Sequence, residues 1–153
     1  MSSSNLTATV VFATITGNNE AVADILVKQL EEAGVEVEKA EMSQSEPEDL
    51  QEKDLAFLVP YTYDEGSLPD EGLDYFDDLK NLDLKNLVYG IAGSGDNFYE
   101  GYYCLALDKF EERMQETGAK EAGPLVRINL YPAKRDEDKL ATLVDASLEA
   151  VKK

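Results

Sequence analysis

Short apolar runs alternate along this chain with longer segments of helical periodicity, and this alternation constrains the fold more than any other feature. Residues 7–13, 55–59 and 87–92 are apolar and β-branched or aromatic, with little polar alternation. Strands buried on both faces of a parallel sheet have this pattern. Parallel strands need a crossover between them, usually a helix. The sequence therefore predicts strands at these runs, with helices between them.

Apolar residues recur every three or four positions in three of the intervening segments, 18–33, 103–114 and 140–151. Gly34 and Gly118 follow the first two and are typical helix stops. These three segments are therefore predicted to be the main helices.

Two short helices are also predicted. Ser45-Glu46-Pro47-Glu48 has the spacing of a capping box, with proline in the first turn. Leu73, Phe76 and Leu79 would share one face of the other helix.

Two weaker runs complete the predicted sheet. Residues 35–38 alternate between apolar and charged, which suits an edge strand, and 125–130 is the expected fifth strand. Residues 93–101 are rich in glycine and polar residues and are expected to form a loop. The predicted fold is an α/β sandwich in one domain, 1–153, with helices on both faces of a five-stranded parallel sheet.

The charge and the missing residue types exclude several classes of function. The chain has 32 acidic and 14 basic residues, a formal charge of −18, and no histidine. Without histidine, Ser-His-Asp and Cys-His catalysis and imidazole metal ligands are excluded. A strongly acidic body repels nucleic acid and anionic membranes, so neither is expected as a partner. Basic protein surfaces suit it better.

The sequence also suggests where the protein works. Its one cysteine, Cys104, cannot form an internal disulfide, which fits a reducing cytoplasm, and we expect it to pack as a small apolar residue. The first residues show no signal peptide, and no run approaches 18 apolar residues. We therefore expect a cytoplasmic protein with no membrane span.

Ligands of such sheets bind beyond the carboxyl ends of the strands. The first loop there, 14–19, offers two hydroxyls, two side-chain amides and the free N–H groups of a helix start, which together favour an anion. It contains no lysine or arginine, and neither a P-loop signature nor a Gly-x-Gly-x-x-Gly fingerprint occurs. An ordinary capped helix start has the same residues.

The other two loops offer aromatic and backbone groups. Tyr63 lies in the polar stretch 60–69, and Tyr99 follows the glycines of 93–95. Either tyrosine alone could simply pack on its own loop. Because all three loops meet at one end of the sheet, they predict a site for a phosphorylated flat heterocycle, stacked between aromatic side chains.

Three segments resemble the loops of the flavodoxins, the small electron-transfer proteins that carry FMN. Residues 14–20, Thr-Ile-Thr-Gly-Asn-Asn-Glu, resemble the family's phosphate loop, Thr-x-Thr-Gly-Asn-Thr-Glu. Residues 62–69 and 93–99 resemble the loops that bear the inner and outer aromatic residues. The resemblance covers nearly the whole chain in element order, and the short fifth strand suggests the short-chain branch. It implies the strand order 2-1-3-4-5 and non-covalently bound FMN.

The resemblance also implies roles for individual residues. Phosphate contacts would come from the first loop, the flavin would lie between Tyr63 and Tyr99, and the peptide after Asp64 would face flavin N5. Backbone groups around Ser94, Gly95 and Asp96 would bind the pyrimidine edge. The full predicted site is Thr14, Ile15, Thr16, Gly17, Asn18, Asn19, Tyr61, Thr62, Tyr63, Asp64, Ser94, Gly95, Asp96, Phe98 and Tyr99.

Three residues depart from the family pattern. Asn19 stands where threonine or serine is common, Asp64 stands where glycine is frequent, and Pro60 has no N–H to donate. These departures affect individual contacts with the cofactor.

The function implied by the resemblance is one-electron transfer at low potential between a reductase and acceptor oxidoreductases, by a monomeric protein without catalytic residues. Its partners would dock on the acidic stretch between Asp64 and Asp78. One alternative is a flavodoxin-like FMN enzyme or a specialised redox activator. A phosphorylatable receiver domain has the same sheet order, but Thr14 and Tyr61 or Thr62 stand where it needs acidic residues.

Overall fold

The structure, a computed structural model, describes residues 6–12, 18–41, 47–59, 77–79, 82–85, 87–95, 105–123, 126–129 and 134–151. Its strands are β1 (Thr7–Phe12), β2 (Glu36–Glu41), β3 (Leu55–Val59), β4 (Val88–Gly95), β5 (Lys120–Glu121) and β6 (Val126–Asn129). Its helices are α1 (Asn18–Glu32), the 3₁₀ helix η3 (Pro47–Glu52), α3 (Leu105–Glu116) and α4 (Lys134–Val151).

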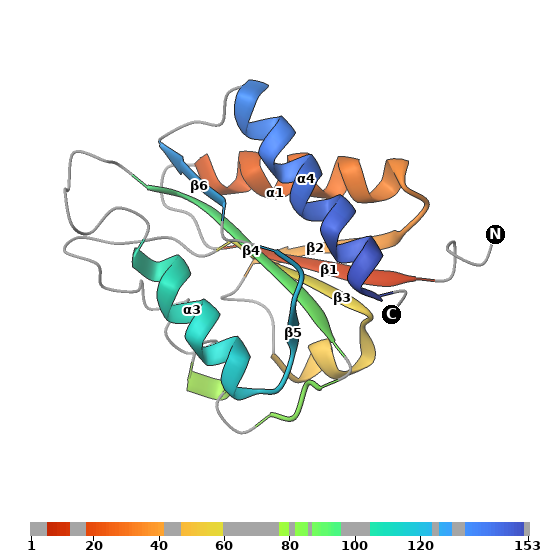
Figure 1. Ribbon diagram of the computed structural model, residues 1–153, viewed down its shortest axis with the longest axis vertical. Helices are drawn as coiled ribbons and strands as arrows, with labels where there is room; N and C mark the ends of the chain where they lie inside the picture. Colours follow the sequence, from red (N-terminus) through yellow and green to blue (C-terminus); the bar gives the residue numbers. More distant parts are fainter. Residues whose placement is uncertain are drawn as a thin grey trace.

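All strand pairs are parallel, and the sheet runs β2-β1-β3-β4-β5, with β6 also paired to β4. Two short strands thus share the fifth position, β5 beside the start of β4 and β6 beside its end (Figure 1). The predicted five-position order 2-1-3-4-5 is confirmed. The chain crosses from β1 to β2 through α1, from β2 to β3 through η3 and from β4 to β5 through α3, as parallel strands require a crossover.

The helices cover both faces of the sheet, which gives three layers. In Figure 1, α1 and α4 lie on one face and α3 lies on the other. Alternate residues of the central strands serve the two faces: Phe57 packs in the core under α1 and α4, whereas Leu58 packs in the core under α3. Because both faces are covered, all five residues of β3 are buried, which is why its sequence shows no polar alternation.

Helix α1 ends as its sequence predicts. Gly34 has a φ of 86°, a conformation that other residues adopt only with strain. The N–H of Val35 donates to the carbonyl of Leu30, and the N–H of Gly34 donates to that of Glu31. These two bonds form a Schellman cap, and Val35 and Leu30 lie in the same buried cluster. The cap turns the chain directly into β2.

Two predictions about the strands need correction. Gly93, Ser94 and Gly95 were expected in a loop, but they continue β4 and pair with Arg127, Ile128 and Asn129 of β6. Glycine and serine have low strand propensity, so the sequence pattern hid this extension. The expected strand 125–130 is β6, while β5 was not foreseen because two polar residues show no periodicity.

The remaining predictions differ mainly at element ends. The edge strand β2 is longer than the expected 35–38, and the short helix predicted at 45–48 is η3. Of the predicted helix around 73–79, only 77–79 is described, and it is helical. Leu73, Phe76 and Cys104 lie outside the described residues.

A small polar cluster lies at the start of β4, under α3. Tyr89 is fully buried and pairs in register with Glu121 of β5. Burial first, and then the charges of Glu121 and Glu111, raise the pKa of the Tyr89 hydroxyl. Burial, followed by the hydrogen bond and charge of Glu111, raises the pKa of Glu121 from 4.5 to about 7. The two carboxyl groups are therefore best accommodated with a proton between them.

Gly90 lies where the sheet and helix α4 pack so closely that an added Cβ would meet its neighbours at unusually short distances. A Cβ there would lie 3.0 Å from the Phe57 ring and 3.1 Å from Leu143 Cδ2. We expect Gly90→Ala to lower the free energy of unfolding by about 1–3 kcal/mol, because the ring must shift in a close-packed core. Urea unfolding measures this. Gly123→Ala is the control, since its Cβ would meet neighbours at 3.6 Å; equal losses for both variants would contradict the packing explanation.

The Glu111–Glu121 pair predicts a pH dependence of stability. Glu121 has a pKa of about 7 in the fold, against an ordinary value of 4.5. The folded state therefore binds more protons than the unfolded state between these values, and stability falls as pH rises through this window. We expect Glu121→Gln to flatten the decline and to stabilise the protein above pH 7.

The gain from Glu121→Gln should be about 1 kcal/mol, less than the full pKa shift implies, because Glu121 is only partly buried. Urea unfolding at pH values from 5 to 8 checks this expectation, with Glu112→Gln as control, because Glu112 is exposed and lies next to Glu111 on α3. The same decline in wild type and Glu121→Gln would refute it.

Candidate functional site

The carboxyl ends of three neighbouring strands define the candidate site. Phe12, the last residue of β1, pairs in register with Val59, the last residue of β3, and β4 lies on the other side of β3. From β1 the chain crosses through α1 to β2 at one edge, while from β3 it leads to β4 in the opposite direction. This point of divergence between β1 and β3 is a topological switch point, where open α/β sheets bind ligands.

The first turn of α1 supplies one side of this site. The helix begins at Asn18, within the predicted phosphate segment 14–19, and β1 ends at Phe12, just before that segment. The first N–H groups of a helix have no partner within it, and the helix dipole adds partial positive charge there. An anion held at this point is therefore favoured without a basic side chain.

The end of β4 supplies another side. The last β3–β4 pair is Leu58–Ile91, whereas β4 pairs with β6 as far as Gly95 and Asn129. Ser94 and Gly95 thus extend past the paired part of β3, and no strand in the described ranges lies on their β3 side. Backbone groups of an unaccompanied strand end can hydrogen-bond a ligand, and glycine allows its close approach. This edge fits a flat, polar ring such as the pyrimidine edge of a flavin.

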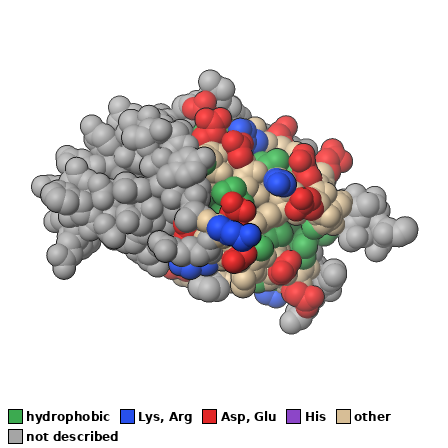
Figure 2. Space-filling view, turned by 90° about the horizontal axis from the view of Figure 1, so that it is seen from above, with side chains coloured by type: hydrophobic (Ala, Val, Ile, Leu, Met, Phe, Trp, Pro, Cys, Tyr) green, Lys and Arg blue, Asp and Glu red, His purple; other side chains and the backbone are tan. Residues whose placement is uncertain are grey.

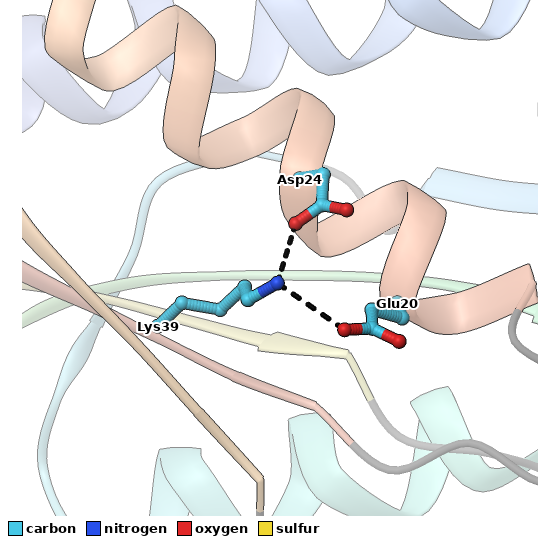
Figure 3. Close-up of polar contacts among 3 residues, drawn as sticks. All are labelled: Glu20, Asp24 and Lys39. Atoms are coloured by element: carbon cyan, nitrogen blue, oxygen red, sulfur yellow. Dashed lines mark hydrogen bonds and ion pairs between the residues drawn. The ribbon is translucent and has the colours of Figure 1, made fainter.

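A charged cluster lies beside the first turn of α1 (Figure 3). Lys39 of β2 reaches up to the helix, where its Nζ lies 2.6 Å from Asp24 Oδ1 and 3.3 Å from Glu20 Oε2. The same Nζ lies 5.6 Å from the centre of the Phe12 ring at the end of β1. The hydrogen bond to Asp24, with the contributions of Glu20, raises the pKa of Lys39 against the opposing effect of its burial, so Lys39 is a cation at neutral pH.

The structure describes only part of the predicted site. It places Asn18 and Asn19 in the first turn of α1 and Ser94 and Gly95 at the end of β4, and their contacts with the cofactor stay predictions. The other predicted residues lie outside the described ranges: Thr14, Ile15, Thr16, Gly17, Tyr61, Thr62, Tyr63, Asp64, Asp96, Phe98 and Tyr99.

Sequence reasoning missed Lys39. The segment before it was interpreted only as an edge strand, and an exposed lysine on an edge strand is usually a solvated residue. The strand register would have indicated its position: Lys39 pairs with Val10 of β1, two residues before the end of that strand and the predicted phosphate segment.

The described surface is strongly acidic. Figure 2 shows Asp and Glu side chains spread over the part of this face that is described, with fewer Lys and Arg between them. Within the described ranges, no three acidic or cysteine side chains are grouped so as to hold a metal ion. Among the helices described, none combines the length and the apolar character that crossing a membrane requires.

Fold and strand edge together define an open, doubly wound α/β protein with a ligand site at the β1/β3 switch point. Comparison with known proteins identifies the family. The family model for flavodoxin matches residues 10–142. Probable flavodoxin 2 of Bacillus subtilis is 36% identical over 131 residues, covering 85% of this chain and 86% of that protein.

Solved structures agree with the sequence match. A short-chain flavodoxin associated with a bacterial microcompartment superposes with a TM-score of 0.93 at 41% identity, covering 95% of this chain and 99% of the other. The flavodoxin of Streptococcus pneumoniae TIGR4 superposes with a TM-score of 0.89 at 37% identity, covering 94% and 98%.

The chain belongs to the flavodoxin family. Flavodoxins bind FMN and are electron-transfer proteins rather than enzymes, so the predicted cofactor and the predicted role as an FMN-based electron carrier are confirmed. Neither the receiver domain nor the enzyme alternative is favoured by these matches. Bound FMN supplies the redox chemistry, while the protein binds it, orients it and sets its potential.

Proposed function

We propose that this flavodoxin holds the FMN phosphate between the end of β1 and the first turn of α1, with the isoalloxazine ring against the end of β4. The convergence of the β1, β3 and β4 ends beside the N-terminus of α1 supports this assignment. The contacts are those predicted from the sequence: Thr14, Thr16, Asn18, Asn19 and the backbone from Ile15 to Asn19 for the phosphate, Tyr63 and Tyr99 for stacking, and the backbone at 94–96 for the pyrimidine edge.

The acidic surroundings tune the bound cofactor toward low potential. Full reduction tends to leave negative charge on the flavin ring, and this protein already carries a formal charge of −18. Adding a negative charge near other negative charges costs free energy, most of all where stacked aromatic rings exclude water. The second electron is therefore the harder one to add, which suits transfer of one electron at a time.

The partners in this proposal are a reductase and acceptor oxidoreductases with basic docking faces, met in the cytoplasm by a monomeric flavodoxin. Charge complementarity raises the rate of encounter more than it raises affinity. The proposed docking surface is the acidic stretch from Asp64 to Asp78. Its described end supports this, because Asp77 and Asp78 are exposed while Leu79 next to them is buried.

The phosphate assignment predicts that FMN binds far more tightly than riboflavin. Loop donors that meet a phosphate are left unsatisfied when it is missing, and each such group costs about 1–3 kcal/mol. The affinity should therefore differ by about a hundredfold or more, since 1.4 kcal/mol is a factor of ten. Quenching of flavin fluorescence on titration with apoprotein measures both constants, with FAD as a further control. Similar affinities for FMN and riboflavin would contradict the assignment.

The docking assignment predicts a salt-dependent association rate with a flavodoxin reductase. We expect Asp77→Asn with Asp78→Asn to slow association about twofold to threefold at low salt, because two steering charges are lost. The difference should shrink gradually as salt shortens the screening length, about 10 Å at 0.1 M. Stopped-flow reduction of the flavodoxin measures the rate.

The matched control is Glu31→Gln with Glu32→Gln, which removes the same charge from the exposed C-terminal end of α1. An equal slowing by both double variants would show that net charge alone matters, and would reject this docking surface.

A further inference from the structure

We propose that Lys39 is a positioning residue for the phosphate end of FMN, acting through both flanks of loop 13–17 and through the charge of Glu20 and Asp24. The proposal rests on the phosphate assignment made above. Lys39 lies on β2, outside every segment that the family resemblance singled out, and its Nζ contacts both elements that the loop joins.

The geometry links the two ends of the loop. The loop begins after Phe12 and ends at Asn18. Lys39 Nζ lies over the Phe12 ring, 5.6 Å from its centre, which is a favourable distance for a cation and an aromatic face. The same nitrogen is within 3.3 Å of Glu20 in the first turn of α1 and within 2.6 Å of Asp24 one turn later (Figure 3). One side chain therefore spans from the end of β1 to the start of α1.

The direction of Lys39 follows from the sheet. Along β2, Val37 and Lys39 point to the same side, and Val37 packs against the core under α1 and α4. Phe12 belongs to that core as well. Backbone pairing of β2 with β1 thus directs the Lys39 side chain to the α1 side of the sheet, where it contacts the helix.

The charges of Lys39, Glu20 and Asp24 would affect a phosphate bound at the first turn of α1. Glu20 lies in the same first turn whose free N–H groups would receive the phosphate, and Asp24 lies one turn further on. Both carboxylates disfavour a bound phosphate dianion, whereas the helix dipole favours it. Lys39 offsets the carboxylates where they are closest to the site. Without it, two uncompensated negative charges would face a phosphate held only by neutral donors.

The size of the effect follows from exposure. The Lys39 side chain is 32% exposed, and those of Glu20 and Asp24 are 50% and 58% exposed. Solvent and salt therefore screen part of the interaction. Charges at helix ends typically change binding or stability by amounts that correspond to about a twofold to fivefold change in affinity. The change should be smaller at 1 M salt, where the screening length is about 3 Å.

The experiment compares FMN and riboflavin binding to apoprotein variants. We expect Lys39→Met to weaken FMN binding about twofold to fivefold and to leave the binding of riboflavin, which lacks the phosphate, unchanged. Lys39→Arg should keep wild-type affinity for FMN. Adding Glu20→Gln to Lys39→Met should restore much of the loss, because it removes the carboxylate nearest the proposed phosphate.

Lys53→Met is the matched control. It removes the same charge and breaks a comparable ion pair, Lys53–Glu38 at 3.9 Å, but Lys53 precedes the amino end of β3. The carboxyl edge is roughly 20 Å away along the strand. FMN affinity should therefore be unaffected.

Three outcomes would overturn the proposal: equal losses for FMN and riboflavin, an equal loss in Lys53→Met, or no effect of Lys39→Met. If Lys39→Met does not fold by circular dichroism, Glu20→Gln alone provides the test, and FMN affinity should then rise. An unchanged or lower FMN affinity would reject the proposal. These results are distinct from failure of the proposed function, which would appear as wild-type protein that does not prefer FMN to riboflavin.

Discussion

Parallel hydrogen bonding between β1 and β3 sets the position of every element that the proposed site uses. The register places Phe12 beside Val59, so two chain segments more than forty residues apart end at the same level. From that level α1 departs on one face, and β4 extends beyond its last pair with β3 as far as Gly95. A flavin at this edge could therefore contact the start of α1 and the end of β4 at the same time. The fold supplies the site by the alignment of its strand ends.

The core holds that alignment in place. Phe57, Gly90 and Leu143 meet in the layer under α1 and α4, where a methyl group added at Gly90 would lie only 3.0–3.1 Å from its neighbours. Leu26 and Leu30 anchor α1 in the same layer, and the cap at Gly34 fixes where the helix ends. Packing of the C-terminal half of α1 thus also fixes the position of its first turn, because the helix is one rigid element. Binding of an anion at that turn needs little rearrangement of the described scaffold, which lowers the ordering cost of binding.

The elements that could be predicted from the sequence are those in which burial repeats along the chain. The runs at β1 and β3 are apolar because both faces are covered, and the stripe that begins at Val22 reports the buried side of α1. The strand nature of Ser94 and Gly95 could not be predicted, since it depends on pairing with β6, which sequence periodicity does not record. The role proposed for Lys39 depends on register as well. Motifs predicted which loops would meet a ligand, but they carried no information about a side chain on a neighbouring strand.

The overall negative charge and the charges close to the proposed phosphate site have opposite effects in this protein. A formal charge of −18 favours basic partners and disfavours the fully reduced flavin, but it also opposes a phosphate dianion. At physiological salt, exposed charges beyond about 8 Å are largely screened. Distant carboxylates therefore affect the rate of encounter with partners more than they affect phosphate binding. Carboxylates in the first two turns of α1 would affect phosphate binding directly. Lys39 pairs with those two, Glu20 and Asp24, and leaves the rest of the acidic surface unchanged. A strongly acidic carrier can thus hold an anionic cofactor when compensation is confined to the turn that receives the phosphate.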